Sequence, residues 1–180
     1  MVDLQDSCGF EQMYEAYFRR IYNYVFCRLL HKEQTEDVVS RIFMKVLEKR
    51  QSYDERKASF NTWIFTIARN TLNDFYRLRK AEVSIDDDRF AEPAINFEEQ
   101  SRLIADEELR ELYMALTDLD EKTRMVITLK YFGEFTNREI SVQTGINEST
   151  VSTLCGRGIA KLQKTMESMQ KTGRGCGSQT

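Results

Sequence analysis

Aromatic, amide and basic side chains alternate between positions 53 and 80 of this sequence, and they are the residues best suited to chemistry. The set comprises Tyr53, Phe60, Trp63, Phe65, Arg69, Asn70, Asn73, Phe75, Tyr76, Arg77, Arg79 and Lys80. Aromatic faces stack on unpaired bases while basic side chains pair with phosphates, so this mixture indicates a site for single-stranded DNA. Phe60, Trp63 and Phe75 also share one helical stripe with Ile67, and packing in a core is the alternative interpretation.

A second candidate site begins at a capping signal near residue 136. The stretch Thr136-Asn137-Arg138-Glu139 reads as a capping box before a short helix, in which Ile140 and Val142 are expected to face inward. Gly145 then supplies a turn and Asn147 caps the last helix, an order that predicts a helix-turn-helix. Its second helix would present to duplex DNA the side chains of Asn147, Glu148, Ser149, Thr150, Ser152, Thr153, Arg157 and Lys161.

The sequence lacks the common catalytic and metal-binding patterns. It contains no nucleophile elbow, P-loop, dinucleotide-binding glycine loop or His-Glu-x-x-His pair, so we expect no enzymatic activity. Cys27 and the only histidine, His31, stand four residues apart and could share a helix face. Two ligands do not complete a zinc site, and the other three cysteines are scattered. We therefore expect neither a metal nor a cofactor.

The elements that must position these sites are all predicted to be helices. Apolar residues recur at three- and four-residue steps over residues 10–30, with Tyr14 and Phe18 in the stripe, and again over 34–50. A third helix is predicted from its N-cap Ser59 to about Lys80.

The helical pattern returns in the second half of the chain. It covers residues 109–116 and 125–132, and Gly133 is the predicted C-cap of the second of these segments. The last helix is expected to end near Met169, and one proline in 180 residues leaves few points at which helices must break.

Charge divides the chain into three parts, although the net charge is only −3. Residues 1–80 hold 14 basic and 11 acidic side chains, residues 81–121 hold 3 and 14, and residues 122–180 hold 9 and 4. We therefore predict an all-α fold with two small helical domains, at 1–80 and 106–170, joined by an acidic flexible linker at 81–105. The glycine-rich residues 171–180 are predicted to be a disordered tail.

Five short stretches carry a resemblance to a known family. They are QTEDVVSRIFMKVL at 34–47, FNTWIFTIARN at 60–70, TNREI at 136–140, STV at 149–151 and RGIAKL at 157–162. Their order and spacing resemble the conserved regions of the extracytoplasmic-function (ECF) sigma factors of the sigma-70 family, over about residues 10–165.

The resemblance implies the fold and the sites of such a factor. The first domain is then a region 2-like bundle of three to four helices, and the second is a region 4-like helix-turn-helix bundle. Core RNA polymerase would be bound by Glu36, Asp37, Ser40, Arg41, Met44 and Lys45. The promoter −10 element would be bound by Tyr53, Phe60, Asn61, Trp63, Arg69, Asn70, Asn73 and Arg77. The −35 element would be bound by the eight helix-turn-helix residues named above.

The sequence departs from the family pattern at two places. Ser40 and Arg41 stand where Gln and Glu are usual, which changes the polarity of one polymerase contact. Residues 152–156 replace positions that are often basic, which leaves fewer phosphate contacts. Gly156 and Gly158 also lie inside the last helix, where together they cost about 2 kcal/mol of helix propensity relative to Ala.

The function implied by the resemblance is that of a sigma factor, which selects promoters for RNA polymerase and nucleates their melting. An anti-sigma factor is implied as a further partner. A stand-alone helix-turn-helix regulator of duplex DNA and a helical protein-interaction adaptor remain as alternatives. No apolar run approaches the roughly 20 residues of a membrane span, and the first residues carry no secretion signal, so we expect a cytoplasmic protein without membrane insertion.

Overall fold

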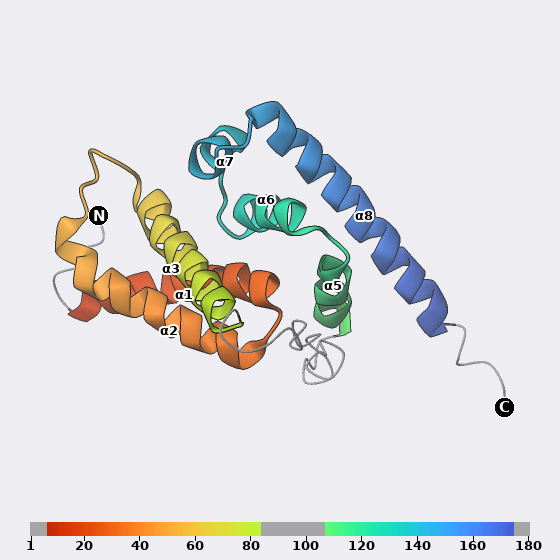
Figure 1. The fold of residues 1–180 in the computed structure, drawn as a ribbon, viewed down its shortest axis with the longest axis horizontal. Coiled ribbons are helices and arrows are strands. Elements are labelled where there is room, and N and C mark those ends of the chain that lie inside the picture. The colour runs from red at the N-terminus through yellow and green to blue at the C-terminus, as the bar shows by residue number, and fades with distance from the viewer. Residues whose placement is uncertain (1–6, 84–106, 175–180) are drawn as a thin grey trace. The chain divides into compact units, whose positions relative to one another are not determined.

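The computed structural model describes residues 7–83 and 107–174. Over these residues every secondary-structure element is a helix, which confirms the predicted all-α fold. The chain divides into two compact units, Met1–Ile95 and Asn96–Thr180. Figure 1 shows the helices of both units. None of the described helices is both long and apolar enough to cross a membrane.

The first unit is built from α1 (Ser7–Leu29), α2 (Lys32–Lys49), the short 3-10 helix η1 (Arg50–Ser52) and α3 (Phe60–Val83). α2 packs against both α1 and α3 (Figure 1). The apolar stripes of the three helices meet in one core, which includes Met13, Ile21, Tyr24, Val25, Val38, Ile42, Val46, Ile64, Phe65, Ala68 and Leu72.

Local signals explain how the helices of this unit begin. His31, the only histidine, is the N-cap of α2, and its Nδ1 atom accepts a hydrogen bond of 3.5 Å from the backbone N–H of Gln34. Cys27, the other member of the pair, is a free cysteine buried in the core. Ser59 caps α3 as predicted, because its Oγ atom accepts from the N–H of Thr62 at 3.2 Å.

The core takes part of the α3 stripe for which the sequence left core packing as an alternative. Ile67 of that stripe is buried, whereas Phe60, Trp63 and Phe75 are half-buried. The core also takes Phe65, whose ring meets the ring of Tyr24 edge-on at a centroid distance of 5.6 Å. The buried face of α3 is therefore wider than the predicted stripe, and the three aromatic residues lie at its edges.

The second unit consists of α5 (Glu107–Thr117), α6 (Glu121–Tyr131), α7 (Asn137–Thr144) and α8 (Glu148–Arg174). α8 packs against the other three helices. The core includes Tyr113, Leu116, Val126, Leu129, Phe135, Ile140, Val151 and Leu162.

Close helix packing in this unit depends on Gly158. A Cβ atom at Gly158 would lie 2.7 Å from the Cγ2 atom of Thr123 and would also collide with Ile127. Gly158 therefore lets α8 approach α6, whereas a Cβ atom at Gly156 would meet nothing within 4 Å.

Two single-residue predictions for the second unit are wrong. Val142 was expected to face inward but is 81% exposed, because a step of two residues from the buried Ile140 turns a helix by about 200°. Gly133 was expected to be the C-cap of α6, but the C-cap is Phe132, and the positive φ of 56° belongs to Glu134. Gly133 serves packing instead, since a Cβ atom there would lie 2.6 Å from the ring of Phe135.

The helix ends also differ from the predicted boundaries. α3 continues to Val83, into the segment predicted as linker, because Ala81 and Glu82 are good helix formers. α8 continues to Arg174, into the predicted tail, because no proline interrupts it after Met169. The rest of the predicted linker and tail, residues 84–105 and 175–180, lies outside the described residues.

Candidate DNA and polymerase interfaces

Four aromatic side chains gather around the first turn of α3, and we call Tyr17, Tyr53, Phe60 and Trp63 the aromatic cluster. The ring centroids of Tyr53 lie 5.3 Å from those of both Phe60 and Trp63, and Phe60 and Trp63 are 5.4 Å apart. Tyr17 of α1 adds an edge-on contact with Phe60 at 5.2 Å. All four are half-buried, so their packing holds the rings in place while part of each remains accessible.

The loop between η1 and α3 holds Tyr53 against this cluster. Asp54 accepts hydrogen bonds from the backbone N–H of Arg56 at 3.0 Å and from its Nε atom at 3.1 Å, and these bonds lower the pKa of the Asp54 carboxyl. The pKa of Tyr53 is raised, chiefly by burial and also by the charge of Glu55. A tyrosine hydroxyl is protonated at neutral pH even at its ordinary pKa of 10.0, so Tyr53 can donate a hydrogen bond.

Polar side chains continue along α3 from the aromatic cluster. Asn70, Asn73 and Arg77 are exposed. Trp63, Asn70 and Arg77 are seven residues apart, so they lie on one side of the helix. Asn70 and Asn73 line a groove of about 380 Å³ together with Lys45 and Lys49 of α2. Sequence reasoning did not single out Lys49, although its place in the basic last turn of α2 was a signal.

Arg69 and Asn61 turn toward α1 instead. Arg69 is half-buried and close to the enclosed Tyr24, whose pKa is raised by burial and lowered to a smaller extent by Arg28 and Arg69. Asn61 accepts a hydrogen bond from Arg20. The structure thus separates Arg69 from the other predicted −10 residues, and it adds Tyr17 and Arg20 of α1, which sequence spacing could not connect with α3.

The outer face of α2 carries the residues predicted to bind the polymerase. Glu36, Asp37, Ser40, Arg41 and Met44 are exposed, and Met44 has 57% of its surface accessible. Lys45, in contrast, is half-buried, and its Nζ atom forms an ion pair of 3.4 Å with Asp74 of α3. A large exposed apolar side chain among charged neighbours is typical of a protein-binding surface.

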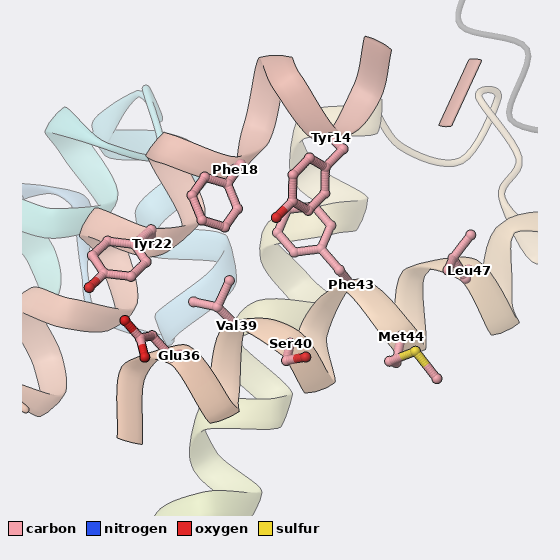
Figure 2. Close-up of a pocket in the computed structure, with 9 residues that line it drawn as sticks. All are labelled: Tyr14, Phe18, Tyr22, Glu36, Val39, Ser40, Phe43, Met44 and Leu47. Atoms are coloured by element: carbon pink, nitrogen blue, oxygen red, sulfur yellow. The ribbon is translucent and has the colours of Figure 1, made fainter. Parts of the chain in front are cut away.

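Met44 also lies between two grooves. On one side, α2 and α3 enclose a groove of about 470 Å³, which Met44 shares with Leu78. On the other side, α1 contributes Tyr14, Phe18 and Tyr22 to a groove of about 280 Å³ (Figure 2). The Tyr14 ring lies 4.8 Å from the Phe43 ring, yet Tyr14 and Phe18 remain 38% and 36% exposed. These two residues therefore border the groove, although the sequence placed them in an apolar stripe.

The helix-turn-helix forms as its local signals predicted. Thr136 and Glu139 make the capping box of α7, and α7 ends at Gly145, whose φ is 73° and whose N–H donates to the carbonyl of Ser141 at 2.9 Å. Asn147 then accepts a hydrogen bond of 2.9 Å from the N–H of Ser149. Gly145 takes a left-handed conformation that most other residues adopt only with strain.

The first turns of α8 present a continuous polar surface. The buried Val151 anchors the helix, and the six predicted residues from Asn147 to Thr153 are exposed, as is Arg157. Lys161 lies about 18 Å beyond Ser149 along the helix axis. Its Nζ atom donates to the backbone carbonyl of Asp118, so this side chain fastens α8 to the end of α5.

The described residues contain no group of three or more His, Cys, Asp or Glu side chains that could hold a metal ion. What the arrangement offers is a set of binding surfaces: aromatic rings beside a polar groove, an exposed helix start, and an apolar residue on a charged helix face. These surfaces suit stacking, hydrogen bonding to DNA and protein docking.

Comparison with known proteins identifies families for both units. Residues 13–82 match the family Sigma-70 region 2, and residues 109–162 match the family Sigma-70, region 4. The chain is 27% identical to the ECF RNA polymerase sigma factor SigX of Bacillus subtilis, over 90% of this chain and 86% of SigX. It is 30% identical to the RNA polymerase sigma factor YlaC of the same organism, over 87% of this chain and 91% of YlaC.

Two solved structures share the fold. The sigma factor RpoE of Bartonella quintana, in complex with the anti-sigma factor NepR, has a TM-score of 0.69 and 22% identity, over 88% of this chain and 96% of that chain. CnrH in complex with the cytosolic domain of CnrY has a TM-score of 0.63 and 21% identity, over 91% of each chain. Since both sigma-70 regions match in order and the sequence relatives cover most of both chains, this chain belongs to the ECF sigma factors of the sigma-70 family.

Proposed function

We propose that this ECF sigma factor uses its three described surfaces at three successive steps of initiation. As a sigma factor it binds core RNA polymerase, directs it to specific promoters and starts transcription there. Sigma factors are not enzymes, so the bond-forming chemistry belongs to the polymerase. The proposal assigns particular residues of this chain to each step.

The outer face of α2 binds the polymerase in this proposal. Met44 supplies an exposed apolar anchor, and Glu36, Asp37, Ser40 and Arg41 surround it with polar and charged groups. An apolar centre with a polar rim is the usual anatomy of a specific protein interface. Lys45 contributes less, because its charge is already paired with Asp74.

The start of α8 reads the −35 element as duplex. Its exposed hydroxyl, amide and carboxylate groups, from Asn147 to Thr153, can bond with base edges in the major groove. Arg157 lies on the same helix and suits a phosphate contact. Lys161 is assigned to the structure of the unit rather than to DNA, because it is engaged with Asp118.

The aromatic cluster captures unpaired bases of the −10 element, and this is the observation that carries the proposal. Its rings are packed against one another yet partly accessible, beside a groove lined by Asn70, Asn73 and Lys49. Rings held in this way can stack on bases, while the groove accepts the sugar-phosphate backbone of the same strand. A regulator of duplex DNA would need only the helix-turn-helix, and an adaptor would need neither DNA surface.

An anti-sigma factor is a further proposed partner. The RpoE of Bartonella quintana is seen in complex with the anti-sigma factor NepR, and the exposed face of α2 is a surface that such a partner could cover. Because the polymerase and its DNA template occupy the cytoplasm of a bacterium, we place the protein there as well.

Run-off transcription with purified core polymerase tests the proposal. The template is the promoter that wild-type holoenzyme selects from a pool of random duplexes. We expect Met44→Glu to prevent assembly with polymerase in gel filtration, and Ser152→Glu to assemble but to lose about tenfold in promoter binding. Trp63→Ala should assemble and bind, but its permanganate footprint should show about a tenfold loss of melted DNA.

Matched variants separate these losses from general damage. Met44→Leu keeps the apolar surface, Gln163→Glu adds the same charge to an exposed site farther along α8, and Trp63→Phe keeps a ring. Met44→Leu should assemble with polymerase, and Gln163→Glu should bind the promoter, within about twofold of wild type. The amount of melted DNA with Trp63→Phe should lie between the amounts with wild type and with Trp63→Ala. The proposal would be contradicted if the wild-type chain did not support promoter-specific initiation. It would also be contradicted if Met44→Glu, Ser152→Glu and Trp63→Ala all failed at the same step.

A further inference from the structure

Arg20 links α1 to the first turn of α3 and to the aromatic cluster. Its Nη2 atom donates a hydrogen bond of 2.9 Å to the Oδ1 atom of Asn61. The same guanidinium lies 5.1 Å from the ring centroid of Tyr17 and 5.5 Å from that of Phe65. One half-buried side chain therefore contacts the start of α3, the aromatic cluster and the core.

The chemistry of the two side chains fixes the orientation of the Asn61 amide. A guanidinium has only donors, so the amide atom at hydrogen-bonding distance from Arg20 must be the oxygen. Turning the amide by 180° would set its NH₂ group against the N–H groups of Arg20, with the loss of a hydrogen bond to a charged donor. The Asn61 nitrogen therefore points away from Arg20.

The orientation of an amide decides which base edge it can recognise. An NH₂ group donates to acceptors such as a base carbonyl or ring nitrogen, whereas the oxygen accepts from an exocyclic amine. Asn61 follows Phe60 of the aromatic cluster directly, and the family resemblance implies that it binds the −10 element. An amide held in one orientation discriminates between bases. An amide that can turn over pairs equally well with a donor or an acceptor on the base.

We propose that Arg20 is a positioning residue for −10 recognition, which fixes the Asn61 amide and supports the Tyr17 side of the aromatic cluster. The inference rests on the function proposed above for the aromatic cluster and on the −10 role that the family resemblance implies for Asn61. Arg20 acts through these neighbours, since the ring of Tyr17 that it covers is in turn 5.2 Å from that of Phe60. A lysine could not replace it fully, because an ammonium lacks the planar fork that donates to Asn61 while lying over the rings.

Base preference measured on the holoenzyme tests this role. The selected promoter is prepared with each of the four bases at every −10 position, and the rate of open-complex formation is followed by permanganate reactivity. We expect Arg20→Met to lower the rate about tenfold on the preferred promoter, from loss of a charged hydrogen bond. The preference among the four bases should flatten at one −10 position, and assembly with polymerase should not change.

Arg19→Met is the matched control, because it removes the same charge from an exposed neighbour on α1. It should keep the wild-type base preference and a rate within about twofold of wild type. Arg20→Lys should fall between wild type and Arg20→Met. If Arg20→Met does not fold, as judged by its thermal unfolding, Arg20→Lys carries the same measurement, since it keeps the charge and the aliphatic stem.

A double-mutant cycle with Asn61→Ala distinguishes positioning from a merely structural role. If Arg20 acts through Asn61, adding Arg20→Met to Asn61→Ala flattens the base preference no further. An unchanged base preference in Arg20→Met, or a further change in the double variant equal to that of Arg20→Met alone, would overturn the inference and leave the proposed function intact. If Asn61→Ala itself alters neither rate nor preference, the proposed role of Asn61 fails together with the inference.

Discussion

Glu139 shows how one side chain stabilises the helix-turn-helix. Its carboxylate accepts hydrogen bonds from the backbone N–H of Thr136 at 2.8 Å and from the Thr136 hydroxyl at 2.7 Å. The Thr136 Oγ atom in turn accepts from the N–H of Glu139 at 3.2 Å. These bonds favour the ionised carboxylate and lower the pKa of Glu139 from its ordinary value of 4.5.

The lowered pKa predicts how α7 responds to acid. A carboxyl group with a depressed pKa in the folded state stabilises that state above its unfolded pKa, and the contribution is lost as the pH falls through the folded pKa. We expect Glu139→Gln to weaken the protection of α7 amides at pH 7, as measured by hydrogen exchange of the full chain. The difference from wild type should shrink as the pH falls below about 4.5.

Glu167→Gln provides the control, because Glu167 is exposed on α8 and remote from the capping box in sequence. It should leave the protection of α7 unchanged at every pH. A difference between Glu139→Gln and wild type that persists undiminished at pH 3 would show that the ionised carboxylate is not what stabilises the cap.

Single residues were predictable from the sequence where a local signal decided their role. The caps Ser59, Thr136 and Asn147 and the turn at Gly145 depend on neighbours within four residues, so the sequence contains all that determines them. Gly133 was misassigned because packing, not a backbone angle, favours a glycine there, since a Cβ atom would collide with the backbone carbonyl of Leu129 and the ring of Phe135.

At the level of elements, periodicity predicted the helices but not the full buried face of α3. Ile67 is buried, as packing of its stripe in the core requires, but Phe65 lies outside that stripe and joins the core through its contact with Tyr24 of α1. The same limit applies to the site, because Tyr17 and Arg20 join Phe60 and Asn61 from about 40 residues away in the sequence. Contacts between helices cannot be read from the spacing within one helix.

The packing of α8 on α6 predicts that alanine substitutions at two glycines of α8 change stability in opposite directions. Gly158→Ala forces a methyl group against Thr123 and Ile127, and we expect it to destabilise the second unit by about 1–3 kcal/mol. Gly156→Ala meets open space and should stabilise α8 by about 0.5–1 kcal/mol through helix propensity. Hydrogen exchange of α6 and α8 amides in the full chain measures both effects.

Each glycine variant serves as the control for the other, since both make the same chemical change two residues apart in one helix. The sequence alone assigned the same propensity cost to both positions, and the packing of α6 distinguishes them. Equal effects of the two substitutions, in either direction, would mean that α6 does not approach α8 closely at Gly158.

For the molecule as a whole, the distribution of charge predicts weak DNA binding without polymerase. The net charge is −3, and the two parts that carry the DNA surfaces, residues 1–80 and 122–180, have only modest basic excesses of 14 over 11 and 9 over 4. Non-specific binding to duplex DNA depends on phosphate neutralisation by basic side chains. A chain of this composition therefore needs the polymerase to supply much of the affinity.

Fluorescence anisotropy with a labelled promoter duplex measures this dependence. We expect the isolated full chain to bind with a dissociation constant no tighter than about 10⁻⁶ M near physiological salt. Holoenzyme should bind the same duplex far more tightly, and a duplex with a scrambled −35 element is the control for specificity. Tight and sequence-specific binding by the isolated chain would contradict the prediction and favour a stand-alone regulator.

Trp63 is the only tryptophan of the 180 residues, and it lies in the aromatic cluster. Its indole is half-buried between Tyr53 and Phe60, at the place where an unpaired base is proposed to stack. Light absorbed near 295 nm excites tryptophan selectively, and a base stacked on the indole quenches its emission. The chain thus carries an intrinsic optical reporter, and short single-stranded −10 oligonucleotides can be titrated against it without any attached dye.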